Sequence, residues 1–171
     1  MALDNTHIII IKETSFEDLD NTFTLWNSGE VMKFVGFPNG LGITHEKLQK
    51  WLKYIENKRP KTNHYSIYDE VIGYCGETFY SIYELGYASL DIKLLPVAQG
   101  RGIAYKALSY AIEEAFKQGA IKVWVDPNPN NIKAISLYER LGFVRSQMPK
   151  HLINQEDLDN IDFIPVYMEK S

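Results

Sequence analysis

Leu90-Asp-Ile-Lys-Leu-Leu-Pro-Val-Ala-Gln-Gly-Arg-Gly-Ile-Ala104 is the most informative stretch of this 171-residue sequence. It predicts a strand followed by a turn, and the glycines of that turn open directly into a helix. The first N–H groups of a helix have no partner inside it and carry a partial positive charge, so such a turn can bind an anion. Gly100 and Gly102 let a ligand approach the backbone, and Arg101 adds a cation. An ordinary helix cap is the alternative interpretation of so short a motif.

The glycine spacing excludes two common nucleotide-binding motifs. The dinucleotide motif needs a third glycine, which residues 103–106 lack, and a P-loop needs Gly-Lys followed by Ser or Thr. Apolar residues then recur at helical spacing until Gly119, which favours a long amphipathic helix over residues 100–118.

Elements on both sides of this stretch give the fold class. Period-two patterns predict strands, and 3.6-residue patterns predict helices. The expected strands are residues 8–12, 64–69, 71–80, 86–95, 121–125, 143–147 and 163–169, and the expected helices are 16–28, 44–58, 100–118 and 132–141, with a short helical piece at 31–35. The order β-α-α-β-β-β-α-β-α-β-β predicts one α/β domain over residues 1–171, with a mixed, mainly antiparallel central sheet flanked by helices.

A second informative segment follows the strand at residues 121–125. Pro127 and Pro129 remove two N–H donors, so this strand should stop pairing with its neighbour early and leave a cleft. On the next helix Asn131, Ala134 and Tyr138 share one face. Each residue alone also has a purely structural interpretation. Asn131 can be a helix cap, and Tyr138 can be a core residue.

Together the two segments resemble the GNAT superfamily of acetyl-CoA-dependent N-acetyltransferases. Gln99-Gly-Arg-Gly-Ile-Ala104 matches the pyrophosphate loop of that family, and Asn131-x-x-Ala-x-x-x-Tyr138-x-x-x-Gly-Phe143 matches its second acetyl-CoA motif. The resemblance extends from Ile8 to Lys170 and implies the GNAT fold, with acetyl-CoA as cosubstrate and direct transfer to an amine in a ternary complex.

The resemblance also implies roles for individual residues. Backbone N–H groups of the loop would hold the pyrophosphate, and a bulge in the preceding strand would free main-chain groups at Ile92 and Leu94 for the thioester carbonyl and the pantetheine arm. Asn131 would contact the pantetheine or position the loop. Tyr138 would protonate the leaving thiolate. The cofactor-binding residues implied in this way are Ile92, Leu94, Gln99, Gly100, Arg101, Gly102, Ile103, Ala104 and Asn131.

The general base is left open by the sequence. Deprotonating a lysine-like amine at pH 7 costs about 4.6 kcal/mol and an α-amine only about 1 kcal/mol, so the need for a base depends on the acceptor. The candidates are Asp91, Glu77 on the preceding strand, and a water relay. Asp91 and Ile92 should face opposite sides of the sheet unless a bulge intervenes.

Composition narrows the class of protein. Eighteen basic and 22 acidic residues give a net charge of −4, which argues against a nucleic-acid partner. The single cysteine, Cys75, fits a reducing cytoplasm, and the four histidines, including His7, show no metal-ligand spacing, so no metal is expected. The amino terminus shows neither a secretion signal nor a membrane span.

The acceptor is less clear than the reaction. Residues 30–36 resemble the ribosomal-protein N-terminal acetyltransferases, whereas residues 72–74, 126–131 and 166–168 resemble the aminoglycoside 6′-N-acetyltransferases. Four carboxylates at positions 156, 157, 159 and 162 would attract a polycation such as a polyamine or an aminoglycoside if they line the acceptor mouth. The expected acceptor is a primary amine, either a peptide N-terminus or a small amine. A CoA-binding sensor without catalysis is the alternative, and a homodimer through edge strands is possible.

Overall fold

A seven-stranded sheet organises the molecule, which a computed structural model describes over residues 8–171. The strands are β1 (Ile9–Glu13), β2 (Thr62–Asp69), β3 (Gly73–Ile82), β4 (Tyr87–Leu94), β5 (Lys122–Val125), β6 (Val144–Arg145) and β7 (Met168–Lys170), in the order β1-β2-β3-β4-β5-β7-β6. Only the pairing of β4 with β5 is parallel; the others are antiparallel. The mixed sheet and its β2–β4 meander confirm the expected fold class.

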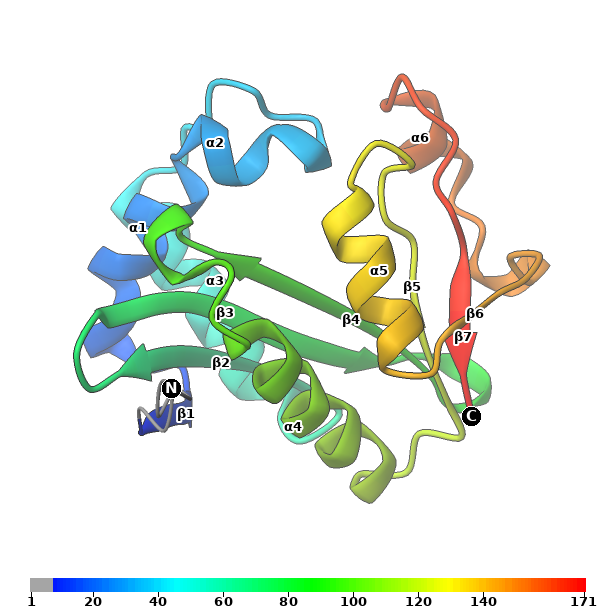
Figure 1. The fold of residues 1–171 in the computed structure, drawn as a ribbon, viewed down its shortest axis with the longest axis horizontal. Helices are drawn as coiled ribbons and strands as arrows, with labels where there is room; N and C mark the ends of the chain where they lie inside the picture. The colour runs from blue at the N-terminus through cyan, green and yellow to red at the C-terminus, as the bar shows by residue number, and fades with distance from the viewer. Residues whose placement is uncertain (1–7) are drawn as a thin grey trace, which may run out of the picture.

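Helices cover both faces of the sheet. The α-helices are α1 (Leu19–Trp26), α2 (Gly29–Met32), α3 (His45–Lys58), α4 (Ile103–Lys117), α5 (Ile132–Arg140) and α6 (Gln155–Asp159), and the 3-10 helices are η1 (Phe16–Asp18), η2 (Lys33–Val35), η3 (Glu84–Gly86), η4 (Pro96–Ala98) and η5 (Lys150–Leu152). In Figure 1, α4 lies in front of β2–β4 and α3 behind them. The two layers therefore enclose the sheet between them.

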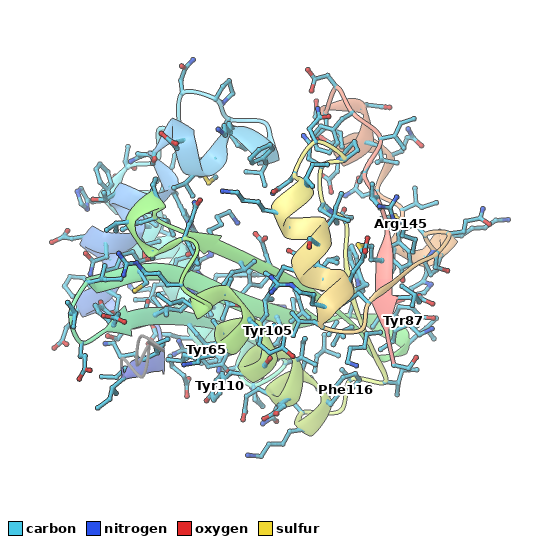
Figure 2. The ribbon with its side chains drawn as sticks, in the orientation of Figure 1. Tyr65, Tyr87, Tyr105, Tyr110, Phe116 and Arg145 are labelled. Carbon is cyan, nitrogen blue, oxygen red and sulfur yellow. The ribbon has the colours of Figure 1, made fainter. Side chains whose placement is uncertain are left out.

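The long helix α4 supplies one side of the main core. Its apolar stripe is buried as expected, and Ala107, Leu108 and Ala111 are fully covered. Tyr110 packs edge to face on Tyr65 of β2, with 5.2 Å between ring centroids, on the side shown in Figure 2. Through these contacts α4 packs against the sheet, with its amino-terminal end after β4.

β4 and β5 separate after three residue pairs. Tyr87, Ala88 and Ser89 pair with residues 122–124, and no later residue of β4 pairs with β5. The reason is the Pro127/Pro129 turn, since proline cannot donate to a ladder. Pro127 instead accepts a hydrogen bond from the N–H of Val166 at 2.9 Å. Figure 1 shows the two strands diverging, with α5 beside the gap.

Two sequence expectations are wrong in detail. The last two strands are shorter than expected. In the second of them, Pro165 lies within the expected range and has no N–H for a ladder. The expected bulge in β4 is absent, since β3 pairs with β4 in unbroken register from Ala88 to Leu94. A register shift does occur opposite β3, between Ile67 and Tyr68 of β2.

Residues 1–7, which include His7, lie outside the described part of the chain. The expectation that the amino terminus carries no secretion signal falls on these residues. Within residues 8–171, no helix is both long and apolar enough to cross a membrane.

Candidate active site

One large cavity opens where β4 and β5 separate. Its volume is about 1340 Å³, which exceeds the ~300–1,000 Å³ typical of pockets for a single small molecule. Its walls come from α2 and η2, the carboxyl half of β4, the start of α4, the segment from β5 to α5, and residues 148–165. A cavity of this size can accept an extended ligand together with a second substrate.

Asp91 and Asp126 occupy matching positions on the two separated strands. Ser89 pairs with Trp124 in the parallel register, so the residues two positions further on, Asp91 and Asp126, would be opposite each other if pairing continued. Paired residues of parallel strands share a sheet face, and both carboxylates line the cavity. The sequence analysis identified Asp91 but missed Asp126. Asp126 lies 35 positions further along the chain, in an Asp-Pro-Asn-Pro segment whose residue types are those of an ordinary turn.

Asp126 has an unusual environment for a carboxylate. Its side chain is exposed and forms part of the cavity wall. Partial desolvation by the surrounding walls, followed by the negative charges of Asp91 and Asp157, raises the pKa of Asp126 to about 6. A carboxylate with a pKa near neutrality is suited to accept and release a proton at physiological pH.

Asp91 is more constrained than Asp126. Its Oδ2 pairs with the ammonium group of Lys93, and its Oδ1 accepts a hydrogen bond from the N–H of Ile92 at 2.8 Å. Burial opposes the charge on Lys93, but Asp91 and Glu77 outweigh it and raise the pKa of Lys93, which is therefore a cation at neutral pH. As strand alternation requires, the side chains of Asp91 and Ile92 point to opposite faces of the sheet.

The main-chain groups of β4 explain how Ile92 and Leu94 face the gap without a bulge. The N–H of Leu95 donates to Cys75 on β3 at 2.8 Å, and the carbonyl of Gly86 accepts from Ile121 beside β5 at 2.8 Å. Because these directions alternate along a strand, even-numbered residues of β4 direct their N–H and C=O groups toward β5. Where β5 has turned away, the N–H groups of Ile92 and Leu94 therefore point into the cavity.

The loop before α4 has the features expected of an anion site. Gly100 and Gly102 have φ of 74° and 76°, and Gly102 is the N-cap of α4. A Cβ at either glycine would meet nothing within 4 Å. The positive φ angles therefore require glycine here, and the space above the loop is open to a ligand. The first turn of α4 contains no acidic residue that would repel an anion.

Individual loop residues differ in what they can offer. The N–H of Gln99 donates to Pro96 at 3.2 Å, so the amides available to a ligand begin at Gly100. Arg101 donates from Nε to Val97 at 3.0 Å. The Ile103 side chain is buried and anchors the start of α4, while Ala104 lines the cavity. The loop thus lies at the start of α4, while the N–H of Gln99, expected to bind the pyrophosphate, already has a partner within the chain.

Tyr138 lies against the cavity with its hydroxyl free. The ring packs on Phe143 at 5.6 Å, and among residues 8–171 the hydroxyl has no hydrogen-bond partner. Burial, and then the charges of Asp91 and Asp126, raise the pKa of Tyr138 well above its ordinary value. The hydroxyl therefore keeps its proton at neutral pH and can donate it to a developing anion.

Asn131 acts as the N-cap of α5. Its side-chain oxygen accepts a hydrogen bond from the N–H of Ala134 at 3.3 Å, while the residue also lines the cavity. The structure thus places Asn131 where it positions the first turn of the helix that carries Tyr138.

Glu77 is buried away from the cavity. Its carboxylate contacts Nε2 of His64 at 2.5 Å and Nε1 of Trp26 at 2.7 Å, and Nζ of Lys93 is 3.9 Å away. Burial raises the pKa of Glu77, but His64, Lys93 and Trp26 outweigh it and lower the pKa overall. A buried, partnered carboxylate of low pKa is unsuited to remove a proton from an incoming amine, so the structure disfavours Glu77 as the base.

The acidic segment after η5 reaches the cavity at one point. Asp157 lines it opposite Glu30 of α2, whereas the other three carboxylates of the segment are not part of the wall. No group of three His, Cys, Asp or Glu side chains within residues 8–171 has the arrangement of a metal site.

Comparisons with known proteins agree with this geometry. A family model described as an acetyltransferase (GNAT) domain matches residues 9–144. The chain therefore belongs to the GNAT acetyltransferase family. A curated relative, N-alpha-acetyltransferase MAK3 of Arabidopsis thaliana, is 33% identical over 66 residues, which span 39% of this chain and 34% of that protein.

Solved structures show the same fold at low identity. A ribosomal-protein-alanine N-acetyltransferase from Brucella melitensis has a TM-score of 0.74 at 19% identity, covering 94% of this chain and 98% of its own. The spermidine N-acetyltransferase of Vibrio cholerae, solved with CoA and spermine, has a TM-score of 0.73 at 18% identity, covering 94% and 92%. The aminoglycoside acetyltransferase AAC(6′)-Ib, solved with coenzyme A, has a TM-score of 0.72 at 19% identity, covering 96% and 95%.

Proposed function

We propose that this protein transfers the acetyl group of acetyl-CoA directly to a primary amine, in a ternary complex formed in the cavity between β4 and β5. The observation that carries the proposal is the separation of these strands, which brings Ile92, Asp126 and Tyr138 to one cavity. The residues fit acetyl-CoA, because the amides from Gly100 to Ala104 at the start of α4 can bind its pyrophosphate and the cavity has the volume to hold its arm.

The donor side of the cavity stabilises the charge that develops on the thioester oxygen. The amine nitrogen attacks the carbonyl carbon, and the oxygen takes up the electron pair of the C=O bond. The N–H of Ile92 would donate to that oxygen, while the N–H of Leu94 would hold the pantetheine arm. When the C–S bond breaks, Tyr138 would give its proton to the leaving sulfur and recover one from solvent.

The acceptor side removes the proton of the amine. We propose Asp126 as the general base, because its pKa of about 6 is suited to proton removal at neutral pH. Among residues 8–171 no ion pair occupies its carboxylate, whereas Asp91 is bound to Lys93. A lysine-like amine must lose a proton at a cost of about 4.6 kcal/mol at pH 7, so this group matters most for a strongly basic acceptor.

One part of the cavity wall is locally negative and favours a cationic acceptor. The wall as a whole is balanced, with the carboxylates Glu30, Asp91, Asp126 and Asp157 and the cations Lys33, Lys93, Lys133 and Arg140. Asp91 and Asp157, however, lie near enough to Asp126 for their charges to raise its pKa. Carboxylates on a partly desolvated wall raise the local concentration of cations. We therefore favour a small amine with a second positive charge, such as a polyamine or an aminoglycoside, over a peptide whose N-terminus carries its only positive charge.

The experiment is a measurement of thiol release from acetyl-CoA against N-terminal peptides, polyamines and aminoglycosides, with acetyl-CoA binding followed by thermal shift. We expect acetyl-CoA to raise Tm and one amine class to accelerate thiol release well above the rate in its absence. Stabilisation by acetyl-CoA without turnover of any amine would favour a CoA-binding sensor instead. Absence of both stabilisation and turnover would contradict the proposal.

A cytoplasmic location and a homodimer also remain predictions. β6 lies at the edge of the sheet, and its outer side pairs with no strand within residues 8–171. Size-exclusion chromatography with light scattering measures the number of chains directly.

A further inference from the structure

The carboxylate of Asp91 occupies the main-chain donor that the thioester carbonyl needs. The N–H of Ile92 points into the cavity, and its bond to Asp91 Oδ1, at 2.8 Å, is made before any ligand arrives. A charged acceptor binds an N–H group about twice as strongly as a neutral carbonyl does. Acetyl-CoA can therefore use this N–H only by displacing Asp91.

The two oxygens of Asp91 have separate partners. Oδ1 takes the N–H of Ile92, whereas Oδ2 pairs with Lys93, whose ammonium also lies 3.9 Å from Glu77. Glu77 is in turn held by His64 and Trp26. Lys93 is thus held by a buried network, so displacing Asp91 from Ile92 frees one oxygen without leaving the carboxylate unpaired.

We propose that Asp91 couples the two substrates: the thioester carbonyl displaces its Oδ1 from the N–H of Ile92, and the freed oxygen then binds the ammonium group of the acceptor beside Asp126. The inference rests on the proposed function, because it assigns the N–H of Ile92 to the thioester. Asp91 is in this view a positioning residue and Asp126 remains the base.

Reciprocity follows from this competition. A ligand that releases the Oδ1 of Asp91 raises the affinity for a cation at the acceptor side, and a cation bound there raises the affinity for the carbonyl by the same factor. A CoA thioether, which has no carbonyl oxygen, lacks this coupling. Acetyl-CoA and the amine therefore strengthen each other's binding, whichever binds first.

The test compares acetyl-CoA with S-ethyl-CoA, which lacks only the carbonyl oxygen, by titration calorimetry on the full chain. In the wild type the competition should hold the two Kd values close together. In Asp91→Ala the N–H of Ile92 is free, so we expect the preference for acetyl-CoA over S-ethyl-CoA to rise about tenfold, the size of a hydrogen bond to a charged group after partial compensation. A purely structural role would change both Kd values equally.

Two further variants make the test secure. Asp91→Asn keeps the shape of the side chain and a weaker, neutral acceptor, so its preference should lie between those of wild type and Asp91→Ala, about threefold above wild type. It also serves if Asp91→Ala does not fold. Asp126→Ala is the matched control, since this carboxylate does not contact Ile92, and its ratio of Kd values should equal that of wild type.

The outcomes separate the two proposals. Acetyl-CoA binding and amine turnover with an unchanged Kd ratio in Asp91→Ala and Asp91→Asn would overturn the coupling alone. Failure of the wild type to bind acetyl-CoA would overturn the proposed function together with the coupling. A rise in the ratio for Asp126→Ala equal to that for Asp91→Ala would also overturn the coupling, because it would trace the effect to general charge.

Discussion

Asp91 and Asp126 occupy matching positions on β4 and just after β5, at the point where the two strands have stopped pairing. The pairing of Ser89 with Trp124 sets their correspondence, and the proline turn after Val125 carries Asp126 away from the ladder. The same separation exposes the N–H of Ile92 and gives Tyr138 access to the cavity. One interruption in the sheet therefore brings the proposed donor, acid and base to one cavity.

Tyr138→Phe tests the acid. The change removes only a hydroxyl that has no hydrogen-bond partner within residues 8–171, so the packing on Phe143 and the stability should persist. We expect kcat to fall roughly 100-fold, with the Kd of acetyl-CoA changed less than threefold. Steady-state kinetics and calorimetry measure the two effects. An unchanged kcat would remove Tyr138 from the mechanism.

Gly102→Ala tests the anion site. At φ 76° an alanine is strained, by about 1–2 kcal/mol, and its methyl group would enter the space above the loop. Gly73→Ala, at φ 83° outside the cavity, is the matched control for strain. We expect similar losses of stability in both variants. Only Gly102→Ala should weaken acetyl-CoA, and neither should weaken acetyl-pantetheine, which lacks the pyrophosphate. Equal acetyl-CoA affinities in the two variants would place the pyrophosphate elsewhere.

Glu77→Gln tests the buried network. The folded-state pKa of Glu77 is lowered, so its charge stabilises the fold above the unfolded pKa near 4.5, and this contribution is lost as pH falls through the folded-state value. We expect the variant to lose roughly 3–5 kcal/mol in free energy of unfolding at pH 7, with a smaller loss near pH 4, measured by urea unfolding. Glu46→Gln, which removes only an exposed pair with Lys50, should change stability by less than about 1 kcal/mol. A similar small effect for Glu77→Gln would contradict the network.

Asp126→Asn should separate stability from activity. The folded-state pKa of Asp126 is raised from 3.8 to about 6, so its ionisation lowers wild-type stability as pH rises between those values. The variant lacks this titration, and its Tm relative to wild type should increase between pH 4 and pH 7. A scan of Tm against pH measures the difference. A relative Tm that falls over this range would show that Asp126 is stabilised as an anion.

The sequence predicted the parts of this site that depend on local spacing. Gly100 and Gly102 lie at the start of α4, and the positions of Asn131 and Tyr138 on α5 agree with the motif. Asp126 could not be found this way, because its relation to Asp91 exists only through the register of two strands distant in sequence. The role of Glu77 was also hidden, since its partner His64 comes from another strand. β6 and β7 were overestimated because β-prone composition does not show where a partner strand ends.

The pH dependence of kcat/KM for wild type and Asp126→Asn tests the central claim most directly. With the best amine from the acceptor panel, the wild-type kcat/KM should rise with pH through a limb near pH 6, as the Asp126 carboxylate forms. In Asp126→Asn we expect that limb to disappear and kcat/KM to fall by about 10²–10⁴, with acetyl-CoA binding retained. A limb near pH 6 that persists in Asp126→Asn, at an undiminished rate, would show that the proton is removed by another group.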